Sequence, residues 1–189
     1  MSHISCYSAA SAARPAQAMY LRAAALCLWL LATGQAHAAT WHESLPQARV
    51  LGQGEFHWFG FSIYSARLWA ETAKVDWNSP FALELVYHRD IGRERFVDVS
   101  VDEIERIGAG RYPAAQLEQW RGVMDHNFVD VHPGDTLIGV YLPGVGCRFY
   151  NREGLIGSVD DPAFARAFFS IWLDPRTRDS GLREKLLGK

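Results

Sequence analysis

The chain has 189 residues, 19 of them basic and 21 acidic, and a formal net charge of −2. It contains no lysine- or arginine-rich block, which argues against a nucleic-acid partner and against electrostatic binding to an anionic membrane surface. Of its three cysteines only Cys147 lies beyond residue 38, and its apolar strand pattern predicts a buried thiol rather than a disulfide.

The first predicted element is an export signal at residues 1–38. The apolar run Ala23–Ala36 follows Arg22 and ends in an Ala-His-Ala cleavage pattern. Cleavage there would leave one domain, residues 39–189, with no stable membrane span, in the periplasm or otherwise exported. An uncleaved anchor is the alternative, although the apolar run is shorter than the about 20 residues of a spanning helix.

The start of this signal has two readings. The 18 residues before Met19 are unusual for a signal peptide, whereas a start at Met19 would give a compact one. Residues 1–18 are therefore either part of the signal or the product of a misassigned start.

The stretch Leu51–Ala70 predicts two adjacent strands that are separated at Gly60. It contains six aromatic residues, which suit a pleated and packed surface. Alternate residues point to opposite faces and both faces are largely apolar, so we expect this pair at the centre of a sheet with helices on one face and partial cover on the other. Gly52-Gln53-Gly54 is not followed by a helix, so it indicates a bulge or a close backbone approach rather than a phosphate loop.

The elements on either side of this pair are a strand before it and a strand and two helices after it. Trp41–Leu45 predicts a short edge strand and Phe81–His88 a third strand of the sheet. Apolar residues recur at helical spacing over residues 96–107, and Ser100-x-x-Glu103 predicts a helix restart at a capping box. Pro113 then opens a helix whose apolar stripe is Leu117, Trp120, Met124 and Phe128.

The last third of the chain predicts a hairpin followed by two helices. Residues 136–142 and 147–151 read as antiparallel strands, and 154–157 as a further short strand. Asp161-Pro162 predicts a helix start, and residues 180–187 a final short helix. We expect the stripe of the longer helix to close over Leu51–Ala70 and, with Trp120 and Met124, to form one wall of a core or cleft; the stripe comprises Phe164, Phe168, Phe169 and Trp172.

These motifs, in this order, resemble the chalcone isomerase-like superfamily and within it the exported bacterial branch. No single motif is specific, but their order and spacing together are, and they span about Leu51 to Gly188. The matching segments are Gly52–Gly54, Phe61–Trp69, Ser79–Phe81, Arg89–Ile91, Asp130–Asp135 and Phe164–Gly188.

The resemblance implies an α+β fold, an open-faced β-sandwich in which an antiparallel sheet is covered by a layer of helices and an apolar cleft lies between them. The family includes isomerases, fatty-acid-binding proteins and members with no known reaction. The isomerases hold their substrate with an arginine, a threonine, a tyrosine and an asparagine. None of the four is retained, because their positions fall at Glu55 or Phe56, Tyr64, Phe96 and Glu103. That loss argues against the plant-type ring closure, since an arginine would anchor the developing oxyanion.

The leading hypothesis is therefore an exported, non-enzymatic binder of a fatty-acid-like or other apolar small molecule, with no catalytic residue, metal or cofactor. Asp125, His126, Asp130 and His132 crowd together, but the two histidines lie six apart, which suits neither a helical nor a strand ligand pair. The cleft candidates are Phe56, Trp58, Tyr64, Arg67, Phe96, Trp120, Met124 and Phe168.

Two alternatives stay open. One is an isomerase or intramolecular lyase with a rearranged polar set of Tyr64, His57, Arg67 and Glu103. The other is an envelope protein that binds a protein partner and no ligand. Arg67 has two readings of its own: an anion anchor at one end of the cleft, or a rim arginine that stacks on Trp69 or pairs with Glu71 or Glu84.

Overall fold

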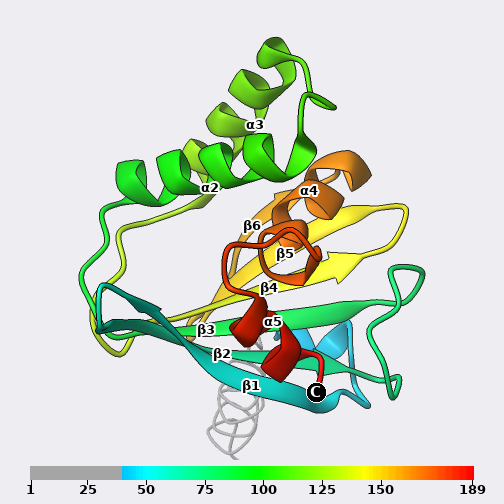
Figure 1. The fold of residues 1–189 in the computed structure, drawn as a ribbon. Helices are drawn as coiled ribbons and strands as arrows, with labels where there is room; N and C mark the ends of the chain where they lie inside the picture. Colours follow the sequence, from blue (N-terminus) through cyan, green and yellow to red (C-terminus); the bar gives the residue numbers. More distant parts are fainter. Residues whose placement is uncertain (1–39) are drawn as a thin grey trace, which may run out of the picture. The chain divides into compact units, whose positions relative to one another are not determined.

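One antiparallel sheet is the framework of residues 40–189, the part of the chain that the computed structural model describes; the predicted signal peptide at residues 1–38 lies outside it. Neighbouring strands pair in chain order as a meander (Figure 1). The strands are β1 (Arg49–Trp58), β2 (Phe61–Ala70), β3 (Phe81–Tyr87), β4 (Thr136–Leu142), β5 (Gly146–Asn151) and β6 (Gly154–Val159).

Four α-helices pack on one face of this sheet, in the order α2 (Arg93–Gly108), α3 (Ala114–Asn127), α4 (Pro162–Leu173) and α5 (Ser180–Leu186). Helix α4 packs on β4 and β5, whereas α2 packs on α3 and α4 (Figure 1). The predicted α+β fold, an open antiparallel sheet under a layer of helices, is confirmed. None of the helices in residues 40–189 has the length and apolar character needed to cross a membrane.

The start of α4 follows its local sequence closely. The Asp161 carboxylate accepts hydrogen bonds from the backbone N–H groups of Ala163 and Phe164, at 2.8 and 3.0 Å. Pro162 occupies the first helical position, where a missing N–H costs nothing. The helix therefore starts where its local sequence signals predict.

The cover over Leu51–Ala70 differs from the prediction, because α5 rather than α4 packs against β1. Gly52 and Gly54 make this possible: a Cβ on Gly52 would lie 2.0 Å from the Lys185 carbonyl oxygen, and one on Gly54 would lie 2.8 Å from a Leu182 methyl. The predicted close backbone approach at the two glycines is confirmed, and a register shift between Val50 and Gly52 adds the predicted bulge.

Three other expectations are corrected. The pair β1–β2 lies at an edge of the sheet and not at its centre. The segment Trp41–Glu43 is a 3₁₀ helix, η1, and not an edge strand. The helix does not restart at Ser100, because the Ser100 hydroxyl donates to the Phe96 carbonyl at 2.8 Å within one continuous α2.

The second face of the sheet is only partly covered. Trp41 and Leu45 pack there on Ala82, Val140 and their neighbours and form a small second core. The main core lies on the helical face and includes Cys147, which is fully buried as predicted.

Candidate functional site

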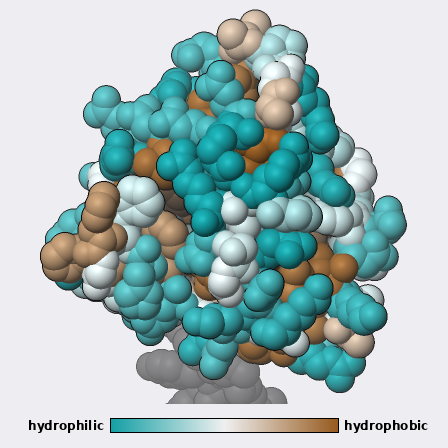
Figure 2. Space-filling model, viewed as in Figure 1, coloured by the Kyte–Doolittle hydropathy of each residue, from teal (hydrophilic) through white to brown (hydrophobic). Residues whose placement is uncertain are grey.

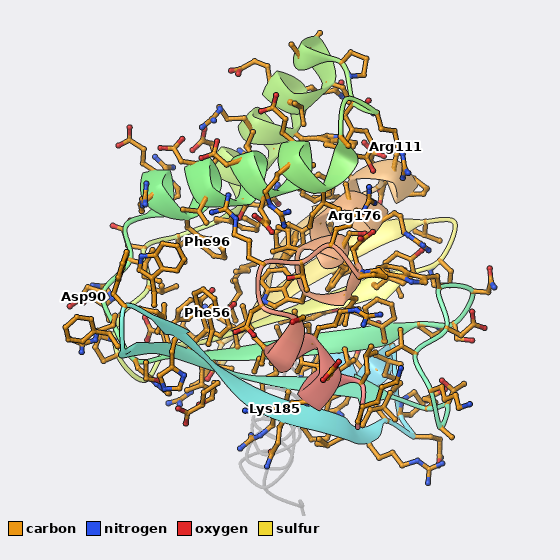
Figure 3. The ribbon with its side chains drawn as sticks, viewed as in Figure 1. Phe56, Asp90, Phe96, Arg111, Arg176 and Lys185 are labelled. Atoms are coloured by element: carbon orange, nitrogen blue, oxygen red, sulfur yellow. The ribbon has the colours of Figure 1, made fainter. Side chains whose placement is uncertain are left out.

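A cavity of about 470 Å³ lies between α2 and the first three strands. Helix α2 packs on its neighbouring helices rather than directly on β1–β3, and the cavity fills the space that this leaves. Figure 3 shows Phe56 of β1 and Phe96 of α2 on the two sides of this space. Its volume falls in the range of about 300–1,000 Å³ that is usual for small-molecule sites.

The walls of the cavity are mainly aromatic and aliphatic. Strand alternation places Phe56, Trp58 and Tyr64 on the same face, so they reach the cavity from β1 and β2. The Phe56 and Tyr64 rings stack at 5.1 Å between centroids. The other apolar groups of the lining are Ile63, Leu85, Tyr87, Ile91, Phe96, Val99, Ile171, Trp172 and Leu182.

Two tyrosine hydroxyls lie among these apolar walls. Tyr64 and Tyr87 are directly opposite each other in the β2–β3 register. The Tyr64 oxygen accepts a hydrogen bond of 2.9 Å from the indole N–H of Trp172. The Tyr87 hydroxyl is buried and has no hydrogen-bond partner among residues 40–189. Burial raises the pKa of both tyrosines, so both groups keep their protons and present O–H donors.

Charged groups gather where α2 meets the segment between α4 and α5. The Glu103 carboxylate accepts hydrogen bonds from Arg178 Nε at 2.6 Å and from Arg106 Nε at 3.0 Å. Burial raises the pKa of Glu103, but the hydrogen bonds and charges of the two arginines outweigh it and lower the pKa overall. Arg106 also donates to the Arg176 carbonyl at 2.7 Å, so this cluster ties the segment between α4 and α5 to α2.

Four of the eight residues predicted for the cleft line this cavity: Phe56, Trp58, Tyr64 and Phe96. Arg67 does not, because its strand position points to the opposite face. There it lies 3.6 Å from Glu84 and 3.4 Å from the Gln53 side chain, which matches the rim reading of this arginine.

Three further candidates belong to the core instead. Trp120 is buried and its indole N–H donates to the Asp161 carboxylate at 2.9 Å. Met124 is fully buried. Phe168 is 3% exposed and packs on Phe128, Phe149, Phe164, Phe169 and Trp172.

The polar set of the isomerase alternative is divided between the two faces of the sheet. Tyr64 and Glu103 line the cavity. His57 lies with Arg67 on the other side, where its ring is 3.4 Å from the Glu55 carboxylate. The two halves of the set therefore do not meet around one substrate.

Sequence reasoning missed the most distinctive groups of the site. Tyr87 ends a strand and reads as one more apolar residue, so only its pairing with Tyr64 draws attention to it. Arg178 lies 75 residues from Glu103, and no local signal joins them. Trp172 belongs to the stripe that was predicted as one wall of a core or cleft. It packs on Phe168 and also lines the cavity, but its hydrogen bond to Tyr64 has no signal in the sequence.

The four residues Asp125, His126, Asp130 and His132 do not form a site with one another. Asp130 accepts a hydrogen bond of 2.7 Å from the Arg93 backbone N–H, and His132 lies 3.4 Å from Asp135. Across residues 40–189, no three His, Cys, Asp or Glu side chains come together as a candidate metal site.

Comparisons with known proteins agree with this architecture. A fatty-acid binding protein of Arabidopsis thaliana has a crystal structure that matches 80% of this chain and 96% of its own, with a TM-score of 0.56 and 13% sequence identity. An uncharacterized protein of Haemophilus influenzae is 29% identical over 140 residues, which is 74% of this chain and 67% of the relative. The model of the chalcone isomerase-like family matches residues 55–188. The chain belongs to the chalcone isomerase-like family.

Proposed function

We propose that this protein is an exported, non-enzymatic carrier of an apolar small molecule with a polar end, of the fatty-acid type. The observation that carries the proposal is the aromatic-walled cavity of about 470 Å³, whose lining includes Tyr87 with a buried hydroxyl that has no hydrogen-bond partner among residues 40–189. A buried hydroxyl without a partner is costly, and a ligand that accepts its hydrogen bond removes that cost.

The polarity of the lining selects the ligand class. Among residues 40–189, the Tyr87 O–H has no acceptor. The Tyr64 oxygen accepts the hydrogen bond from the Trp172 N–H, which leaves the Tyr64 proton for another acceptor. A carboxylate or carbonyl can accept from both phenols, whereas an alkane cannot. The aromatic remainder of the cavity suits an alkyl chain. The Arabidopsis neighbour, which is named as a fatty-acid binding protein, supports this choice.

The same groups favour binding over catalysis. A general base works best with a pKa near the operating pH. Glu103 has a lowered pKa and is occupied by two arginines, and the two tyrosines have raised pKa values. The groups of the cavity are thus set up to hold a ligand rather than to move a proton from it. Chalcone should accordingly not be cyclised above the uncatalysed rate.

Thermal unfolding with a panel of ligands tests the proposal. A ligand that binds only the native state adds about 2.7 kcal/mol at a hundredfold excess over Kd. For a domain of this size that raises Tm by about 5–10 °C. We expect such a shift with medium- or long-chain fatty acids and little or none with alkanes of equal length. No shift with any fatty acid or flavonoid would overturn the proposal and favour the partner-protein alternative.

Export is the second part of the proposal, and it depends on the sequence pattern of residues 1–38. N-terminal sequencing of the protein recovered from the exported fraction should begin at Ala39. A mature protein that begins at Met1 or Met19 would contradict cleavage.

A further inference from the structure

Exposed aromatic side chains project from the turn between β1 and β2, at the mouth of the cavity. Trp58, Phe59 and Phe61, here called the aromatic tip, are 49%, 86% and 58% exposed. Figure 2 shows hydrophobic side chains that protrude beside a hollow, where Figure 1 places the end of this hairpin. Large apolar groups left in water within four residues of each other indicate an interaction site rather than random exposure.

The backbone of the tip adds an independent observation. The turn has two central residues, Phe59 and Gly60, with φ of 48° and 81°. Both positions of such a turn favour glycine or asparagine, and phenylalanine at the first is strained. Phe59 therefore combines an unfavourable backbone conformation with nearly full exposure of an apolar ring. Within residues 40–189 the packing does not account for that combination, since the only aromatic ring there that pairs with Phe59 is its neighbour Trp58.

The tip is continuous with the cavity. Trp58 and Val99 are each about half exposed, and each also lines the cavity, from β1 and α2. Arg89 lines it too, and its guanidinium carbon lies 5.0 Å from the centre of the Phe61 ring. An arginine on the flank of an exposed ring can keep its charge at the headgroup level while the ring enters the acyl region.

The size of the tip distinguishes a lipid surface from a protein partner. An aromatic side chain buries about 150–250 Å², so the three rings expose on the order of 400 Å². A stable protein complex buries about 800 Å² on each partner. A bilayer needs no complementary shape, and a few aromatic rings at a convex point are sufficient to enter it.

From these observations we propose that the aromatic tip docks on a lipid bilayer and holds the cavity mouth against it. Docking depends on insertion of rings rather than on net charge, because the cavity lining carries charges of both signs. These are Asp90, Asp102, Glu103 and Asp179 against Arg89, Arg95 and Arg178. A ligand can then pass between the bilayer and the cavity without crossing water. This purpose depends on the proposed function, but the docking itself is measured without any cavity ligand.

Flotation with lipid vesicles tests the docking. The protein is used with the N-terminus that the cell leaves on it, so that residues before the domain are the same in every variant. Vesicles of phosphatidylcholine alone are compared with vesicles of phosphatidylethanolamine and phosphatidylglycerol. The test variant is Phe59→Asn/Phe61→Thr, because asparagine suits the left-handed turn position and threonine suits a strand. Val145→Asn, at the tip of the β4–β5 hairpin, removes another exposed apolar group as the control.

We expect the wild type and Val145→Asn to float equally, and the test variant to lose about tenfold or more in partition coefficient. Flotation should change little between ~0.1 and ~0.5 M NaCl, over which surface charges become strongly screened. Lipids with brominated acyl chains give a site-specific readout. They should quench part of the tryptophan fluorescence of the wild type, and that quenched part should be missing in Trp58→Phe.

Several results would overturn the docking. The first is that the wild type does not float. The second is that all variants float equally and are quenched equally. The third is that salt abolishes flotation. A wild-type dimer that becomes a monomer in Phe59→Asn/Phe61→Thr would assign the tip to a second copy of the chain instead. A protein that floats as expected but takes up no fatty acid would leave the docking in place and refute the ligand proposal alone.

Discussion

The hydroxyl of Tyr64 accepts a hydrogen bond of 2.9 Å from the indole N–H of Trp172, 108 residues further along the chain. This contact joins β2 to the C-terminal turn of α4 at the wall of the cavity. Directly across the ladder, Tyr87 presents the same hydroxyl at the equivalent position on β3 and has no partner among the described residues. Of these two hydroxyls on paired strands, one therefore has a hydrogen-bond partner within residues 40–189 and the other has none.

Removing each hydroxyl in turn should therefore have different effects on stability. Tyr64→Phe leaves the buried Trp172 N–H without an acceptor, which should lower the unfolding free energy by about 1–3 kcal/mol. Tyr87→Phe removes an unsatisfied polar group and should leave the unfolding free energy unchanged or raise it by up to about 1 kcal/mol. Urea unfolding of the ligand-free protein measures both changes.

The same pair of variants tests the ligand proposal. Tyr87→Phe should weaken binding of a fatty acid by about tenfold, because a ligand carboxylate loses one hydrogen bond. Calorimetric titration with the acid and with its methyl ester separates the carboxylate contact from the alkyl chain. A Tyr87→Phe protein that is strongly destabilised when empty would show that the hydroxyl has a structural partner.

Glu103 makes stability depend on pH in the acid range. Its folded pKa lies below the ordinary value of 4.5, so its stabilising effect is complete above that value. The effect is lost as the pH falls through the folded pKa. Glu103→Gln should lower the unfolding free energy by about 1–3 kcal/mol at neutral pH. The difference from wild type should then shrink as the pH falls below 4.5.

Glu105→Gln is the matched control for this experiment. Glu105 lies two positions further along α2, is exposed, and makes no ion pair within residues 40–189. Glu105→Gln should show the same dependence of the unfolding free energy on pH as the wild type. A Glu103→Gln profile that runs parallel to wild type down to pH ~3 would show that the ion-pair cluster does not form in solution.

Cys147 should be inert while the protein is folded. The side chain is fully buried, and burial raises the pKa of its thiol, so almost no thiolate exists at neutral pH. Peptide mapping after treatment with a thiol reagent should find Cys147 unlabelled in buffer and labelled in denaturant. Labelling in buffer at the rate of a free thiol would contradict this burial.

Local signals made much of the fold predictable. The Asp161-Pro162 start, the two glycines of β1 and the alternation that puts Phe56 and Tyr64 on one face depend on residues close together in sequence. Strand parity in particular was enough to place Phe56, Trp58 and Tyr64 on one face, because it needs only the identity of the strand.

The remaining features depend on contacts between distant segments. An apolar stripe on a helix looks the same whether it faces a core or a cavity, so Trp120, Met124 and Phe168 could not be separated from Phe96. The aromatic density of Leu51–Ala70 suggested a central position, but much of it lines the cavity or forms the exposed tip at the sheet edge.

The contrast between Phe168 and Phe56 gives the sharpest test of where the core ends and the cavity begins. Phe168 is 3% exposed and contacts Phe128, which follows α3, as well as aromatic rings of α4 and β5. Phe168→Ala should therefore lower the unfolding free energy by about 3–5 kcal/mol. Phe56 is half-buried at the cavity, and its ring already borders open space. Phe56→Ala should therefore lower stability by only about 1–2 kcal/mol, because little new void is created. Fatty-acid affinity should fall in Phe56→Ala while the fold survives. Thermal melting of both variants with and without the acid measures the two effects together, and a Phe56→Ala protein with unchanged affinity would show that the ligand does not use this wall.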